Sequence, residues 1–251
     1  MIYTEILTAI FFTLFGLFIG SFLNVCIYRL PRGNFFSKSR SYCPCCRNQI
    51  VWYDNIPLIS WFVLGGRCRN CKEKISIRYP AIEAINMVLW LVCYLVLGFS
   101  IGTVILCIVF SILLVMSMID IDIQEIPNAL ILSIVVLAIP YVFASGLPLW
   151  EHILGAFVMS IPLFVVGIIT GGIGGGDIKL LFATGILLGY KLTLVAGLAG
   201  IIIGALVGVV LLISRKAGRK TAMPLGPALA SGFVIAALWG NQVFDWYIGL
   251  I

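Results

Sequence analysis

The stretch IGTVILCIVFSILLVMSMID, residues 101–120, indicates the fold of this chain most clearly. No charged side chain interrupts it before Asp120 at its end. A helix needs roughly 20 mainly apolar residues to cross the hydrocarbon of a membrane. Because a backbone that crosses lipid must satisfy its own hydrogen bonds, such a segment is helical. Residues 101–119 therefore predict a membrane-spanning helix that is followed directly by an acidic residue.

Similar apolar runs extend on both sides of this stretch. Hydrophobic residues make up 62% of the 251 residues and charged residues 10%, whereas an average soluble domain has about 25% charged residues. So little polar surface excludes a soluble globule, and we expect an all-α polytopic membrane protein with about eight transmembrane helices. The expected spans are residues 6–27, 82–97, 101–119, 129–144, 153–170, 180–189, 192–213 and 225–246.

The run at 180–189 is the weakest of these predicted spans. Its helix would rise only about 15 Å, which is half the thickness of the hydrocarbon. It is therefore a half-span, a re-entrant piece, or part of a helix in which residues 171–179 are partly embedded. Four glycines further along are expected to let helices pack closely: Gly197, Gly200, Gly204 and Gly208.

Positive charge is concentrated between the first two spans. Residues 29–79 hold ten of the sixteen Lys and Arg but only two of the ten Asp and Glu, so this segment carries +8 and the rest of the chain −2. Basic loops remain on the cytoplasmic side of a membrane, which places both termini outside. A second basic cluster then also falls inside: Arg215, Lys216, Arg219 and Lys220. The segment lacks a repeated basic or aromatic pattern, so membrane lipid, and no nucleic acid, is its expected partner.

Eight cysteines fall into two groups. Three lie in apolar runs, where small buried side chains are expected: Cys26, Cys93 and Cys107. The other five lie in the basic segment, where Cys43 with Cys46 and Cys68 with Cys71 form two Cys-x-x-Cys pairs and Cys45 stands within the first pair. Four thiolates suit tetrahedral Zn²⁺, and the reducing cytoplasm disfavours disulfides. We expect a closed, structural zinc site that orders the loop; free thiols are the alternative.

Acidic residues at the edge of apolar spans are costly and suggest a function. Asp120 ends the quoted stretch, and Asp122 lies about 200° further round a helix, so only one of the two faces the bundle interior. Asp177 closes a run of three glycines, where the backbone can bend and another segment can approach. If Asp120 and Asp177 meet, they could activate water and polarise a peptide carbonyl, as in an aspartic protease.

Other interpretations of these acids stay open. Paired acids inside a membrane also serve proton relays, so the chain could be a proton-coupled membrane transporter with a zinc-stabilised cytoplasmic loop. A non-catalytic scaffold of a secretion machine is a third interpretation. Acids at span ends are also often ordinary solvated boundary residues. The single histidine, His152, is expected on the outer side, far from the cysteine pairs.

Three blocks of sequence, in order, resemble the type IV prepilin peptidases. They are GSFLNVCIYRLP at 20–31; the cysteine loop with NIP at 55–57, GRC at 66–68, RYP at 78–80 and Glu83; and DIDIQEIPN at 120–128 with GGGDIK at 174–179. The resemblance implies a membrane aspartic endopeptidase with a GxGD motif. Its catalytic residues would be Asp120, which opens the family's pattern ending in Ile126-Pro127, and Asp177. Asn128 stands where many members have aspartate, and this departure changes neither of the two proposed catalytic residues.

The resemblance also implies substrates and cofactors. Members cut prepilin and pseudopilin leaders after a glycine, between a basic leader and an apolar helix, at the cytoplasmic face of the inner membrane. Many members also N-methylate the new N-terminus from S-adenosylmethionine, and with its cysteine loop this chain resembles the longer, potentially bifunctional form. The expected domains are the first transmembrane helix at 1–28, the basic zinc loop at 29–80, and the transmembrane peptidase domain at 81–251.

A basic leader would be repelled by the +8 segment. We therefore expect it to dock on the acidic stretch that contains Asp122 and Glu125 beside Asp120. Three further residues are expected to shape the site: Gly174, Gly176 and Lys179.

Overall fold

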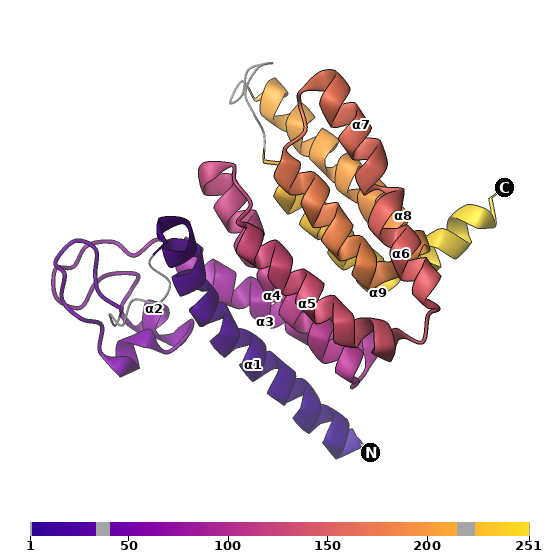
Figure 1. Cartoon of the computed structure of the whole chain (residues 1–251). Coiled ribbons are helices and arrows are strands. Elements are labelled where there is room, and N and C mark those ends of the chain that lie inside the picture. The colour runs from indigo at the N-terminus through magenta and orange to yellow at the C-terminus, as the bar shows by residue number, and fades with distance from the viewer. Residues whose placement is uncertain (1, 34–40, 215–223, 251) are drawn as a thin grey trace. The chain divides into compact units, whose positions relative to one another are not determined.

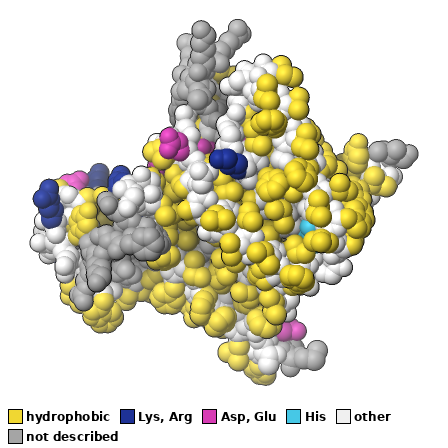
Figure 2. Space-filling model, viewed as in Figure 1, with side chains coloured by type: hydrophobic (Ala, Val, Ile, Leu, Met, Phe, Trp, Pro, Cys, Tyr) yellow, Lys and Arg dark blue, Asp and Glu magenta, His cyan; other side chains and the backbone are white. Residues whose placement is uncertain are grey.

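The computed structural model describes residues 2–33, 41–214 and 224–250, and these are almost entirely helical (Figure 1). The second basic cluster, and Lys38 and Arg40 of the first, lie outside the described residues. Contacts divide the chain into two compact units, Met1–Gly98 and Phe99–Ile251. Apolar side chains cover much of the surface visible in Figure 2, as expected for helices that face lipid.

The first unit is built on two long helices, α1 (Ile2–Arg29) and α3 (Arg78–Leu97), which pack side by side (Figure 1). They approach closely because α1 has glycine at the contact: a Cβ on Gly20 would lie 2.8 Å from Cα of Glu83. The buried Asn86 side chain donates a hydrogen bond to the Gly16 carbonyl at 2.7 Å. A polar side chain is thus satisfied inside an otherwise apolar contact.

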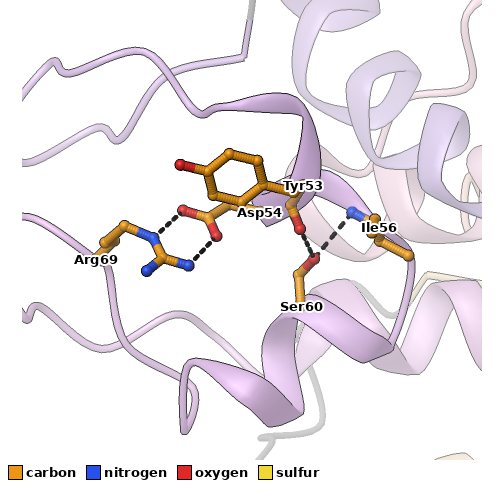
Figure 3. Close-up of polar contacts among 5 residues, drawn as sticks. All are labelled: Tyr53, Asp54, Ile56, Ser60 and Arg69. Atoms are coloured by element: carbon orange, nitrogen blue, oxygen red, sulfur yellow. Dashed lines mark hydrogen bonds and ion pairs between the residues drawn. The ribbon is translucent and has the colours of Figure 1, made fainter.

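Where it is described, the segment between α1 and α3 contains three short helices: η1 (Leu30–Arg32), η2 (Trp52–Asn55) and α2 (Ile59–Val63). Figure 3 shows how side chains hold it together. The Arg69 guanidinium donates two hydrogen bonds to the Asp54 carboxylate, from Nε to Oδ2 at 2.7 Å and from Nη2 to Oδ1 at 2.6 Å. These hydrogen bonds lower the pKa of Asp54. The Ser60 hydroxyl donates to the Tyr53 carbonyl and accepts from the Ile56 N–H, both at 2.9 Å.

The second unit contains six helices in its described residues: α4 (Ile101–Ile123), α5 (Asn128–Ser145), α6 (Leu149–Val158), α7 (Ser160–Thr170), α8 (Gly175–Ile213) and α9 (Gly226–Ile248). Helix α8 lies at the centre and packs against α9, α6, α5 and α7. It crosses α6 where glycine faces glycine, and a Cβ on Gly185 would overlap the Gly155 carbonyl. This close crossing is typical of helices packed in membranes.

Seven segments of the described residues are helical, long and apolar enough to cross a membrane, with α6 and α7 counted together. The all-α polytopic fold is therefore confirmed. The two spans expected at 180–189 and 192–213 both fall within α8, which departs from helical geometry at Gly189 (φ 74°, ψ 171°). The helix also begins at Gly175 rather than near Leu180. Its part before the break therefore rises about 20 Å, longer than the apolar run alone suggested.

Candidate active site

Asp120 lies in the last turn of α4, because this helix continues past the predicted end at Ile119 to Ile123. Gln124 then ends the helix with a positive φ of 56°. Asp120 is 5% exposed, whereas Asp122 is exposed, in agreement with their spacing on a helix. A carboxylate so deeply buried needs polar partners.

Asp177 lies in the first turn of α8, directly after the glycines that precede it in sequence. An acidic side chain is favourable there because the amide dipoles of a helix point their positive end at its start. Asp177 is 9% exposed, and its buried Oδ1 has no hydrogen-bond partner among the described residues. Such an unpartnered buried oxygen is rare and leaves a position for water or a substrate group.

Both carboxylates line one pocket of about 300 Å³. Its other lining residues come from the segment after α4 and the start of α8: Gln124, Glu125, Ile126, Asn128, Gly174, Gly175, Gly176 and Lys179. The pocket thus contains two acids separated by 57 positions in the chain. Of the two acids expected to receive a leader, Glu125 lines the pocket and Asp122 does not.

The predicted site-shaping residues lie around these acids. A Cβ on Gly174 would come within 3.1 Å of Oδ2 of Asp177, and one on Gly176 within 3.0 Å of Cβ of Ile126. The ammonium of Lys179 donates to Oδ1 of Asn128 at 3.0 Å, which links α8 to the first residue of α5.

Gly226, the first residue of α9, contacts Asp120 and was missed by the sequence analysis. Its N–H donates to Oδ2 of Asp120 at 2.9 Å in a buried position. A Cβ on Gly226 would lie 2.7 Å from the same oxygen, which is too close for any side chain. The one signal in the sequence is a glycine between prolines 224 and 227, since proline favours the first turn of a helix.

The four paired cysteines come together in the first unit. Their sulfur atoms all lie within 4.8 Å of one another, and Sγ of Cys43 is 3.8 Å from Sγ of Cys71. A tetrahedron with Zn–S bonds of about 2.3 Å places sulfurs about 3.8 Å apart, so the cluster fits zinc. Backbone N–H groups of Cys71 and Asn70 lower the pKa of Cys68 to about 7, whereas desolvation and the neighbouring thiols raise the pKa of Cys71 to about 12. A bound cation would favour the thiolate form of all four cysteines.

The two cysteine pairs sit in two copies of the same turn. In one, the N–H of Cys43 donates to Asn48 and the N–H of Arg47 donates back to Cys43; in the other, Cys68 pairs in the same way with Glu73 and Lys72. Arg47 and Lys72 have matching positive φ angles of 58° and 60°. Two equivalent turns that present four sulfurs to one point support a structural metal site.

Removing one cysteine of this cluster should therefore release zinc. We expect Cys46→Ser to lower the zinc content of the purified protein from about one equivalent to near zero, as measured by metal analysis. Cys45→Ser is the matched control, because Cys45 is exposed and stands outside the cluster. Equal zinc in both variants would contradict the assignment.

Comparison with known proteins agrees with this architecture. The model of the Bacterial Peptidase A24 N-terminal domain matches residues 14–97, and that of the Type IV leader peptidase family matches residues 107–209. Relatives named prepilin leader peptidase/N-methyltransferase include those of Aeromonas salmonicida (34% identity, 95% of this chain and 93% of the relative), Bacillus subtilis (32%, 94% and 96%) and Pseudomonas putida (35%, 92% and 91%). No solved structure matches the chain significantly.

This chain belongs to the type IV leader peptidase family. The peptidase interpretation is thereby confirmed, and the transporter alternative has no support. Its apolar helices and its family make it a multi-pass protein of the inner membrane. The sides on which its termini lie stay a prediction.

Proposed function

We propose that this chain is a membrane-embedded aspartic endopeptidase that removes the leaders of prepilins and pseudopilins. The observation that carries the proposal is the pocket that Asp120 and Asp177 line together from α4 and α8. Two carboxylates that share one proton are the minimum equipment for aspartic proteolysis.

Asp120 and Asp177 would act on a water molecule held between them. The ionised carboxylate takes a proton from the water, whose oxygen adds to the carbonyl carbon of the scissile peptide bond. The protonated carboxyl group donates its proton toward the carbonyl oxygen, and the C–N bond then breaks as the amine is protonated. The leader leaves with a new carboxylate, and the mature chain leaves with a new amine.

The contacts around the two acids support different tasks for the residues nearby. Gly226 fixes one oxygen of Asp120 at 2.9 Å, so the other oxygen can turn toward the water. Gly174 leaves room beside Asp177, and Gly176 sets the distance between α8 and the segment after α4. Neither glycine could gain a side chain without displacing an acid or Ile126.

Glu125 is the residue we expect to attract the basic leader, because it is exposed and lines the same pocket. Glu125→Gln should lower kcat/KM for a basic leader roughly tenfold at low salt, and added salt should shrink this difference because it screens exposed charges. Asp122→Asn should have a smaller effect, since Asp122 does not line the pocket. The measurement compares leaders whose lysines are kept or replaced by glutamine; equal losses on both leaders would refute leader docking at Glu125.

The relatives' names support a second activity, an N-methyltransferase. The resemblance in sequence implies that it would methylate the new N-terminus from S-adenosylmethionine. The cysteine cluster would hold zinc in a structural role, since four sulfurs leave no open position on the metal. We assign no residue to the methyl donor.

The proposal is tested with the purified protein in lipid vesicles and a prepilin precursor. Mass spectrometry should show a leader that ends in glycine and a mature chain, with one added methyl group when S-adenosylmethionine is present. A precursor that stays intact under all conditions would overturn the proposal.

A further inference from the structure

A second pocket, of about 400 Å³, adjoins the one that holds the carboxylates. Asn128 and Lys179 line both pockets, and the hydrogen bond between their side chains marks the boundary. The remaining lining residues are almost all apolar: Ile131, Leu132, Val135, Ser160, Ile178 and Phe182. We call this second pocket the α5/α8 groove.

The α5/α8 groove follows one face of α5. Its lining positions on this helix are 128, 131, 132 and 135, which is the spacing of a single helical stripe. These positions extend over about 10 Å of helix, away from Asn128 at its start. Ser160, which also lines the groove, donates its hydroxyl to the Ala156 carbonyl, so it presents no unpaired donor to the groove. The groove therefore runs from the acidic pocket along an apolar wall.

We propose that the α5/α8 groove holds the apolar segment that follows the scissile bond of the substrate. The inference rests on the proposed function, which places that bond at Asp120 and Asp177. A substrate that is basic before the bond and apolar after it matches the order of the two pockets, acidic first and apolar second. Lys179, the sole cation among the residues that line either pocket, stands at the boundary between them and so disfavours entry of the basic part into the groove.

The groove acts through shape. Lipid tails are as apolar as the substrate segment, so transfer from lipid into the groove has no hydrophobic driving force and depends on packing. Its contribution is to align the bond with the carboxylates, and misalignment by about 1 Å can lower a rate about 100-fold. A side chain that fills the groove should therefore impair long substrates and spare short ones.

The test uses two substrates with the same cleavage site: a precursor with its full apolar segment, and a peptide that ends a few residues after the bond. Leu132→Trp fills the groove from its rim, where Leu132 is 62% exposed. Ser133→Trp is the matched control, because Ser133 lies on the same helix about 100° round from Leu132, is exposed and does not line the groove. We expect Leu132→Trp to lower kcat/KM for the long substrate at least about tenfold and to leave the short one unchanged.

Each other outcome overturns the inference. Equal loss on both substrates would mean that the substitution disturbs the carboxylates or the fold. Equal loss in Ser133→Trp would mean a general effect of tryptophan on α5. An unchanged rate of Leu132→Trp on the long substrate would mean that the substrate does not occupy the groove, which would then hold lipid. If the wild-type protein cleaves neither substrate, the proposed peptidase function itself is wrong. A failure of the proposed function is thus distinguished from a failure of the groove inference alone.

Discussion

Asp177→Asn and Asp120→Asn should each lower the rate of leader cleavage by about 10³-fold or more. Asparagine has nearly the same shape as aspartate, so the pocket should keep its form. An amide, however, can neither take a proton from water nor hold one for the carbonyl oxygen. The measurement is single-turnover cleavage of a precursor by each purified variant in vesicles.

Asp245→Asn is the control for this loss. Asp245 is an exposed acid in α9 and lines neither of the two pockets. Its variant should cleave at the wild-type rate. A similar loss in all three variants would indicate a general response of the protein to lost charge and would remove the assignment to the two buried acids.

Gly226→Ala should lower the rate about 100-fold while the protein stays folded under the assay conditions. The added Cβ would lie 2.7 Å from Oδ2 of Asp120, so this carboxylate or the start of α9 must move. Alanine itself favours a helix more than glycine does, so no loss of stability is expected from the backbone. Gly226 is a positioning residue because it acts through Asp120.

Gly102→Ala is the matched control on the helix that bears Asp120. A Cβ on Gly102 would make ordinary contacts at 3.6 Å, so its variant should keep the wild-type rate. For Gly226→Ala, the loss should appear in kcat, with KM little changed, because the substitution misplaces a reacting group. A lowered unfolding midpoint with a proportional loss of folded protein would instead assign Gly226 a structural role only.

Local features of the sequence predicted much of this molecule. Uncharged runs such as 101–119 predicted helices because length and apolarity alone decide whether a segment can cross lipid. The Cys-x-x-Cys pairs predicted the cysteine cluster because neighbouring ligands are built into each turn. The break in α8 at Gly189 falls at the boundary expected between residues 180–189 and 192–213, but the start of this helix at Gly175 was not predicted, since glycines are more typical of turns and loops than of a helix.

Contacts between distant segments could not be predicted in this way. The hydrogen bond from Gly226 to Asp120 joins residues 106 positions apart. Its donor is a backbone N–H, a group that nearly every residue carries, so the residue type gives no sign of it. The expected position of His152 at the outer side of the membrane stays a prediction, but its burial was not foreseen: Nδ1 lies 2.7 Å from the Ile186 carbonyl and Nε2 3.0 Å from Oγ of Ser145. Its role is therefore to hold helices together, a property of the packed bundle.

The most direct test of the paired action of Asp120 and Asp177 is the cleavage rate of the double variant Asp120→Asn/Asp177→Asn beside those of the two single variants. Residues that act as one unit are strongly non-additive, so all three rates should fall to the same residual level. A single variant that stays within about tenfold of the wild-type rate, or a double variant whose loss equals the product of the two single losses, would contradict a shared catalytic role.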